Sequence, residues 1–380
     1  MSTTKKGEDV IASYVREGER MAYALGNRGP IQFNSDGTLD KDILDVYFSC
    51  GFYVFEGVVK SEELEDLQAD LEYVFERAPH TKDALVDSKG RPALGTERAR
   101  PTFHFAKPLS DPIGGTSANN GRHPSKMTEL EPPTDAPEFV ISGIGRPLDI
   151  MDSCLRLYGH PQLLSVAEQI NGPDFTPFQE FVVVKPQALG ASVAWHQDGT
   201  THWDKPDWDE DTHGFNFMFQ YYGSTATNGV WVIPGSHKQG KLDIKGMIAA
   251  NGGSDRLPEA VPMVCKPGDV VIANRQVLHA SFPNPSPHKR VSFNFGFHRR
   301  SSVLGVRRKQ YDDQEVVYDE ERIFERSRLI ALAIDARQQR VLNEPRYAYQ
   351  PLVGQENANR WSEEMRKSIL TNYTLRDLPL

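Results

Sequence analysis

Short runs of β-forming residues recur between residues 178 and 298, and turn-forming residues separate them. This pattern of brief strands at regular intervals is typical of antiparallel sandwiches and barrels. The candidate strands cover residues 178–185, 192–196, 215–222, 229–233, 261–264, 269–273, 277–282 and 290–298. Eight strands of this length predict a jelly roll.

Helical patterns flank these strands on both sides. Apolar residues at positions 43, 44, 47 and 48 form a helical stripe, and residues 52–55 follow it as a strand. Residues 9–25, 61–75, 320–342 and a segment from residue 362 also have helical patterns. We therefore expect a mainly β protein with flanking helices (α+β). Residues 1–38 would form an N-terminal extension, residues 39–300 the β domain, and residues 301–380 a C-terminal helical extension.

The apolar stripe of the C-terminal extension must be buried somewhere. It either covers the sandwich or forms a homodimer through the C-terminal helices.

A long segment without strong periodicity interrupts the β domain at about residues 80–145, and Pro, Gly, Asn, Thr and Ser dominate it. Such a segment predicts loop, and loops of this length are usually functional lids or disordered. We favour a lid over a binding site, with Phe103 and His104 as residues that contact a substrate.

Composition excludes several functions. The chain has 43 Lys and Arg residues against 52 Asp and Glu, a formal net charge of −9, which disfavours a nucleic-acid surface. Its apolar runs are too short to cross a membrane. Cys50, Cys154 and Cys265 have no paired spacing, which indicates reduced thiols. With no apolar stretch behind the first residues, we expect a cytoplasmic protein that binds neither membrane nor nucleic acid.

A His-x-Asp triplet ends one of the candidate strands. Residues two apart in a strand project to the same side, so His196 and Asp198 can point together into the sandwich. His279, in a later apolar strand, is the best candidate for a third ligand. Two histidines and one carboxylate form the facial arrangement that holds non-haem Fe(II) and leaves coordination positions open.

A second cluster lies on the strand that returns after His279. Arg290 and Ser292 share one face of this strand, and a guanidinium beside a hydroxyl is a good receptor for a carboxylate. A metal and a carboxylate receptor together describe a site for a 2-oxo acid with a second carboxylate. We therefore expect 2-oxoglutarate as cosubstrate.

These pieces, taken in order, resemble the phytanoyl-CoA dioxygenase family of Fe(II)/2-oxoglutarate-dependent oxygenases. The matching residues are His196-Gln197-Asp198, Asn228-Gly229-Val230-Trp231-Val232-Ile233-Pro234-Gly235-Ser236-His237-Lys238, Pro267-Gly268-Asp269, His279 and Arg290-x-Ser292. The resemblance covers roughly residues 40–80 and 150–300. It implies a double-stranded β-helix core of the cupin-like type, with iron held by His196, Asp198 and His279. It also implies 2-oxoglutarate held by Arg290 with Ser292 in support, and dioxygen as the oxidant.

The implied reaction is hydroxylation or another oxidation of an unactivated C–H bond in a small-molecule metabolite, with release of succinate and CO2. A biosynthetic role is the expectation. Related halogenases replace the carboxylate with a small residue, so Asp198 argues against halogenation. The alternatives are a zinc hydrolase or cupin-type isomerase that uses the same ligands, or a noncatalytic binding module.

Further candidates flank these two clusters. Contacts to 2-oxoglutarate are expected from Gln179, Lys185 and Gln220, and walls of a substrate pocket from Trp195, His202 and Trp203. For each of them ordinary packing is the competing interpretation. His237, in a Pro-Gly-Ser-His turn, is expected to be structural.

Overall fold

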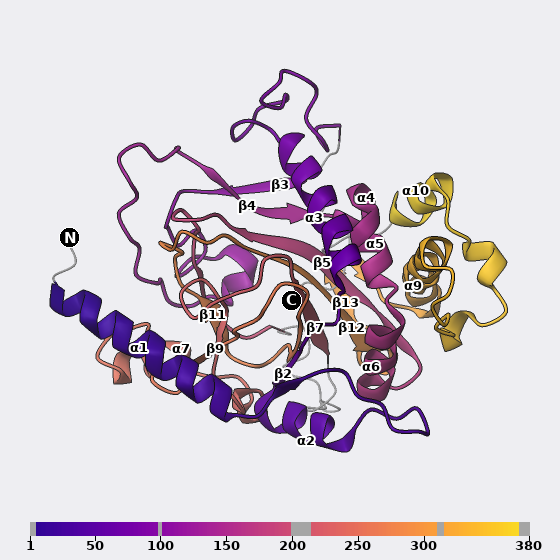
Figure 1. Ribbon diagram of the computed structural model, residues 1–380, viewed down its shortest axis with the longest axis horizontal. Helices are drawn as coiled ribbons and strands as arrows, with labels where there is room; N and C mark the ends of the chain where they lie inside the picture. The colour runs from indigo at the N-terminus through magenta and orange to yellow at the C-terminus, as the bar shows by residue number, and fades with distance from the viewer. Residues whose placement is uncertain (1–4, 98–100, 199–213, 310–314, 372–380) are drawn as a thin grey trace.

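The computed structural model describes residues 5–97, 101–198, 214–309 and 315–371 (Figure 1). The strands are β1 (Arg28–Gly29), β2 (Phe52–Phe55), β3 (Phe103–Ala106), β4 (Val140–Gly145), β5 (Phe175–Lys185), β6 (Val193–His196), β7 (Phe215–Gln220), β8 (Trp231–Val232), β9 (Val261–Pro262), β10 (Val270–Asn274), β11 (His279–Ser281), β12 (Arg290–Arg299), β13 (Arg307–Lys309) and β14 (Glu315–Val317). The helices are α1 (Lys5–Ala24), α2 (Lys41–Cys50), α3 (Ser61–Glu76), α4 (Pro147–Ile150), α5 (Asp152–Tyr158), α6 (Pro161–Asn171), α7 (Ile244–Ala250), α8 (Arg300–Val303), α9 (Glu320–Arg340) and α10 (Glu363–Thr371). Short 3-10 segments are η1 (Ala118–Gly121), η2 (Ser236–Gln239), η3 (Gln350–Leu352) and η4 (Glu356–Asn359).

Two sheets make up the centre of the fold. The larger has eight strands in the order β1-β2-β10-β7-β12-β5-β4-β3, and the smaller has four in the order β6-β11-β8-β9. All neighbouring strands are antiparallel except β1 and β2. Each of the eight strand ranges expected from the sequence overlaps one of these strands. The prediction of a mainly β jelly roll with flanking helices is confirmed.

One face of the large sheet is packed with phenylalanines against helices. Phe217 and Phe219 of β7 and Phe293 and Phe295 of β12 are fully buried there, in one cluster with apolar residues of α5, α6 and α9. These residues alternate along each strand, as period-two side chains do. The helices lie on this outer side of the sheet in Figure 1.

The opposite face of the large sheet points toward the small sheet. Met218 and Val271 lie on this face and pack in one cluster with Val232 and Val261 of the small sheet. Because Arg290 and its alternate neighbours on β12 project away from the phenylalanine side, they also point toward the small sheet. The space between the sheets is therefore where the candidate ligands can meet.

The expectation of loop throughout residues 80–145 is wrong in two places. Strand β3 pairs with β4, and β4 pairs with β5, so both belong to the edge of the large sheet. The four residues of β3 alternate too briefly to be recognised in sequence, and their pairing comes from segments far along the chain. The rest of the segment between β3 and β4 contains no element longer than η1 in the described residues.

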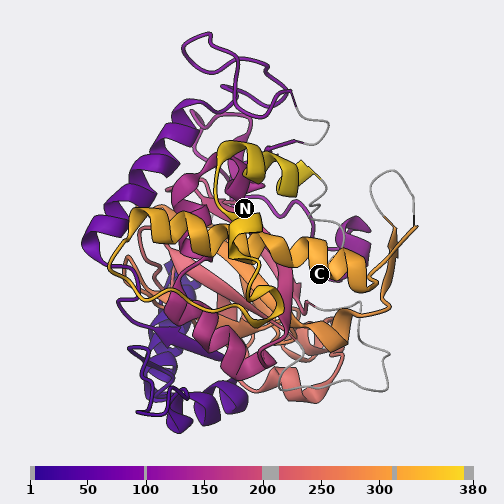
Figure 2. The same ribbon diagram turned by 90° about the vertical axis from the view of Figure 1, so that its right-hand side faces the viewer.

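The C-terminal helices cover the sandwich. Helix α9 packs on α5 and β5, and α10 packs on α9 (Figure 2). Apolar residues of α9, among them Leu329, Ile330 and Ala333, are buried in the same cluster as the phenylalanine face. The apolar stripe of α9 is thus buried within a single chain. No helix among the described residues combines the length and hydropathy needed to span a bilayer.

Helix α1 packs along the small sheet, which carries part of the candidate metal centre. Tyr14 stacks on Trp231 of β8 with ring centroids 4.6 Å apart. Gly18 lies so close to the same indole that a Cβ atom there would be 2.4 Å from it. The helix approaches the sheet this closely because Gly18 has no side chain.

Replacing Gly18 with valine should therefore lower the free energy of unfolding by about 1–3 kcal/mol, the usual cost of an overpacked contact. Urea denaturation measures this loss. The matched control is Ala12→Val on the exposed side of the same helix, where the change in helix propensity costs less than about 1 kcal/mol. Equal losses in the two variants would show that α1 does not depend on this contact.

Candidate metal centre

The register of the small sheet brings two histidines together. Strand β6 ends at His196, β11 begins at His279, and these two residues are directly opposed in the antiparallel pair. Their ring centroids are 4.1 Å apart. Asp198 follows β6 by two residues, and its backbone N–H donates to the carbonyl oxygen of Arg275 at 2.8 Å, which holds the end of this segment in place.

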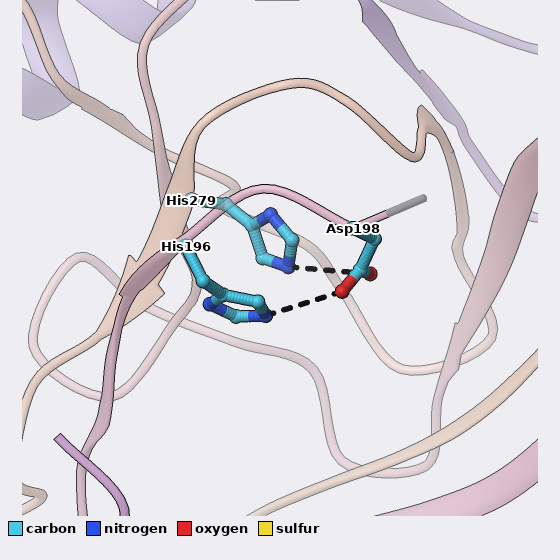
Figure 3. A group of neighbouring side chains, drawn as sticks. All are labelled: His196, Asp198 and His279. Carbon is cyan, nitrogen blue, oxygen red and sulfur yellow. Dashed lines mark ion pairs between the residues drawn. The ribbon is translucent and has the colours of Figure 1, made fainter. Parts of the chain in front are cut away.

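The three side chains converge on one point (Figure 3). His196 Nε2 lies 3.5 Å from Asp198 Oδ1, and His279 Nε2 lies 4.0 Å from Asp198 Oδ2. One ligand atom from each residue falls within 4.8 Å of the other two. The side chains of His196 and Asp198 are buried, and that of His279 is 20 % exposed. This spacing fits three ligands around one ion, with one side open.

Hydrogen bonds to the backbone set the orientation of both imidazoles. His196 Nδ1 lies 2.8 Å from the carbonyl oxygen of Ala194, and His279 Nδ1 lies 2.9 Å from that of Val277. A carbonyl only accepts, so each Nδ1 carries the proton and each Nε2 presents a lone pair toward the carboxylate. Metal-binding histidines are held by outer hydrogen bonds of this kind.

The electrostatic surroundings keep the ligands in their metal-binding forms. Burial lowers the pKa of His196 well below its usual value, and the neighbouring His279 adds to this shift. Burial alone would raise the pKa of Asp198, but Arg122 and His279 outweigh it and hold that pKa below its usual value. A neutral imidazole and an ionised carboxylate are the forms that bind a divalent metal.

A second polar cluster lies on the inner face of the large sheet. Arg290 of β12 is directly opposite Lys185 of β5, and Ser292 is directly opposite Gln220 of β7. All four side chains are buried. Directly opposed residues of antiparallel strands share a face, so these four side chains form one group.

Some polar atoms of this cluster have no hydrogen-bond partner among the described residues. Within the described parts of the chain, Arg290 Nε and Nη1 and Gln220 Oε1 are buried without a hydrogen-bond partner. Lys185 Nζ donates to the carbonyl oxygen of Phe282. Neither cation makes an ion pair with a carboxylate of the described residues. Two buried cations without a counter-ion fit a carboxylate ligand such as that of 2-oxoglutarate.

Burial lowers the pKa of Arg290 to about 10. Burial also lowers the pKa of Lys185 well below its usual value, and the positive charge of Arg290 lowers it further. A guanidinium with a pKa of about 10 is still charged at neutral pH. Arg290 therefore retains the positive charge that a carboxylate requires.

The remaining candidates occupy varied positions. Trp195 is fully buried and its Nε1 donates to the carbonyl oxygen of Asp255 at 2.7 Å. Phe103 is buried in the main apolar cluster, and the exposed His104 contacts the ring of Phe181, both from edge strand β3. His237 Nε2 lies 3.0 Å from the carbonyl oxygen of Phe48.

Three candidates fall outside what the structure describes. His202 and Trp203 lie in the undescribed residues 199–213. Gln179 belongs to β5, but its side chain is among those not described.

Sequence reasoning missed two residues at the metal centre. Arg122 Nη1 lies 2.8 Å from Asp198 Oδ1, and the ring centroid of His123 lies 4.2 Å from that of His196. Both belong to the segment between β3 and β4, where no periodicity indicates the direction of a side chain. Only their residue types, a guanidinium and an imidazole side by side, were available as a signal.

Two sheets that face each other, a His-Asp-His group between them and a buried guanidinium on the inner face define the class of non-haem iron, 2-oxoglutarate-dependent enzymes. The comparisons with known proteins agree. A family model described as phytanoyl-CoA dioxygenase (PhyH) matches residues 47–292, and the chain belongs to this family. Its enzymes use Fe(II), 2-oxoglutarate and dioxygen.

Individual relatives are distant. Phytanoyl-CoA dioxygenase 1 of Oryza sativa subsp. japonica is 28% identical over 163 residues, which cover 41% of this chain and 56% of the rice protein. Dioxygenase lolE1 of Epichloe uncinata is 26% identical over 151 residues, 39% of this chain and 56% of the fungal protein. The chain thus spans little more than half the length of these two relatives. The crystal structure of EctD from S. alaskensis with 2-oxoglutarate and 5-hydroxyectoine aligns with a TM-score of 0.48 and 19% identity, over 72% of this chain and 81% of EctD.

Proposed function

We propose that this chain is an Fe(II)/2-oxoglutarate-dependent dioxygenase that hydroxylates or otherwise oxidises an unactivated C–H bond of a small-molecule metabolite, with release of succinate and CO2. The observation that carries this proposal is the convergence of His196, Asp198 and His279, whose ligand atoms lie within 4.8 Å of one another. Family membership supports it. A biosynthetic role and a cytoplasmic location stay predictions.

One set of residues would bind the metal and another set would bind the cosubstrate. His196 and His279 would offer Nε2 lone pairs and Asp198 a carboxylate oxygen to Fe(II). Bound Fe(II) and 2-oxoglutarate supply the dioxygen chemistry that attacks a C–H bond. Arg290 would bind the far carboxylate of 2-oxoglutarate, since its Nε and Nη1 are buried and unpaired among the described residues. Ser292, Lys185 and Gln220 would complete that receptor.

The protein also controls access of water. His196 and Asp198 are buried, and the ligand with the greatest exposure, His279, marks the open side of the centre. A substrate that enters on this side would exclude water from the reacting groups. Phe103, His104, Trp195, His202, Trp203 and Gln179 stay predictions as further contacts to substrate or cosubstrate.

Release of succinate tests the proposal. Protein with Fe(II), 2-oxoglutarate and dioxygen should convert 2-oxoglutarate to succinate and CO2, faster when a mixture of metabolites contains the substrate. Zn(II) in place of Fe(II), or the variant Asp198→Ala, should abolish succinate formation. A zinc hydrolase or cupin-type isomerase would show no succinate under any of these conditions and activity with zinc, and a noncatalytic module would show neither.

The proposal leaves the substrate at the level of a small molecule. The rice relative is named for phytanoyl-CoA, but only 41% of this chain matches it. A homodimer through the C-terminal helices also stays a prediction, and light scattering of the purified protein tests it.

A further inference from the structure

Two adjacent residues of the segment between β3 and β4 contact the metal ligands. Arg122 directs Nη1 toward Asp198 Oδ1 at 2.8 Å, and its side chain is 13 % exposed. His123 is fully buried, and its ring lies against that of His196. The sequence between β3 and β4 therefore contributes a cation and an imidazole to the edge of the candidate active site.

Polar atoms of both residues lack partners. Neither ring nitrogen of His123 has a hydrogen-bond partner in the described portion of the chain, and Arg122 Nε is also buried and unpartnered there. A buried imidazole or guanidinium N–H without a partner is costly. Native proteins satisfy nearly all such groups, and the exceptions cluster where a ligand binds. These two residues are therefore prepared to bind a group that comes from outside the chain.

The segment that carries them is held by specific hydrogen bonds. The buried carboxylate of Asp111 accepts hydrogen bonds from the backbone N–H groups of Gly114 and Met127, at 2.9 and 2.7 Å. The carboxylate of Asp255 accepts one from the N–H of Thr128 at 2.7 Å. The carbonyl oxygen of His123 itself accepts from the N–H of Gly115 at 2.9 Å. These bonds hold the backbone around the two residues in place before any ligand arrives, which lowers the entropic cost of binding.

We propose that Arg122 and His123 bind a carboxylate group of the primary substrate beside the metal centre, so that the substrate is a carboxylic acid. This inference rests on the proposed function and names its substrate class. Arg122 keeps Nη1 on Asp198 and offers Nε, while His123 offers a ring N–H. A guanidinium and an N–H donor on adjacent residues suit the two oxygens of a carboxylate.

The charges around the site favour a negatively charged substrate. Fe(II) carries two positive charges. Asp198 and the two carboxylates of 2-oxoglutarate together carry three negative charges, one more than the iron. Arg290 and Arg122 add two positive charges, so the site carries an excess of positive charge even before Lys185 is counted.

Acetate and its neutral isostere acetamide test this inference. Each is titrated into the anaerobic complex of the protein with Fe(II) and 2-oxoglutarate, and binding is followed by the visible charge-transfer absorption and by the melting temperature. Wild-type protein should bind acetate at least about tenfold more tightly than acetamide, a difference of about 1.4 kcal/mol. Arg122→Gln should raise the dissociation constant of acetate at least tenfold, and His123→Gln should raise it about tenfold, the lower end of the range for a hydrogen bond to a charged group.

Matched controls are Arg20→Gln and His288→Gln, whose side chains are exposed; both should bind acetate as the wild type does. Equal binding of acetate and acetamide, no saturable acetate binding, or unchanged acetate affinity in both site variants would overturn the inference. So would a loss of iron affinity without loss of acetate affinity in His123→Gln, which would make His123 a metal ligand. If Arg122→Gln fails to fold, the comparison of acetate with acetamide in the wild type and in His123→Gln still decides.

The same titration separates this inference from the proposed function. If Fe(II) and 2-oxoglutarate produce no charge-transfer absorption in the wild type, the function itself is wrong. If the absorption forms but acetate and acetamide behave alike, only the assignment of Arg122 and His123 is wrong.

Discussion

The variant His279→Ala should lose Fe(II) affinity by more than about 100-fold and form no succinate. Loss of an outer hydrogen-bond partner of a ligand usually costs 10- to 100-fold in metal affinity, and loss of a ligand itself should cost more. His279 presents Nε2 to the site because its Nδ1 is held by the carbonyl oxygen of Val277. Anaerobic titration calorimetry with Fe(II) measures the affinity, and succinate formation measures turnover.

The control for this experiment is His288→Ala. His288 is exposed in the turn before β12, so its loss should leave iron affinity within about twofold of the wild type. If His279→Ala binds iron as tightly as the wild type and as His288→Ala, His279 is not a ligand and the metal centre is assigned wrongly.

The variant Arg290→Ala should bind 2-oxoglutarate about 30- to several-thousand-fold more weakly. Removing one partner of a buried, hydrogen-bonded charge pair costs about 2–5 kcal/mol, and each 1.4 kcal/mol is a factor of ten. The Arg290 side chain is buried and faces the small sheet, so water cannot easily replace it as a partner for the carboxylate. Titration of 2-oxoglutarate into the anaerobic iron-loaded protein measures the change.

Two further variants show whether the loss is specific. Arg290→Lys keeps the charge but not the planar fork, so its affinity should fall between those of the wild type and Arg290→Ala. Arg307→Ala removes an arginine whose side chain is 67 % exposed in β13 and should leave the affinity unchanged. An unaltered affinity for 2-oxoglutarate in Arg290→Ala would place the cosubstrate elsewhere.

The strands and the metal ligands could be predicted because their signals are local. Most strands of the sandwich lie in short runs of β-forming residues between turns, and His196 and Asp198 are two residues apart at the end of one strand. His279 could be placed because it follows a strongly apolar strand, β10, and the structure pairs it directly with His196. The pairing itself depends on register, which the pattern alone does not determine.

The segment between α3 and β4 could not be predicted as well, because its order comes from distant contacts. Strand β3 has four residues and finds its partner only after a long stretch of turns and bends. Arg122 meets Asp198 through a segment that hydrogen bonds from Asp111 hold in place. Neither contact has a periodic signature in the sequence, since both depend on tertiary packing.

The pairing of Arg290 with Lys185 could likewise be predicted only in part from the sequence. Each residue was a candidate for cosubstrate binding, but their direct opposition across β12 and β5 follows from the register of two strands more than a hundred residues apart. That opposition leaves two buried cations side by side, which is the stronger argument for a carboxylate ligand.

X-ray diffraction at the iron absorption edge, from crystals grown without oxygen in Fe(II) and 2-oxoglutarate, shows whether the side chains of His196, Asp198 and His279 hold iron. We expect one anomalous peak bonded to His196 Nε2, His279 Nε2 and a carboxylate oxygen of Asp198, with the far carboxylate of 2-oxoglutarate against Arg290. A peak at other side chains, or 2-oxoglutarate bound away from Arg290, would show that the metal centre or the cosubstrate site is assigned wrongly.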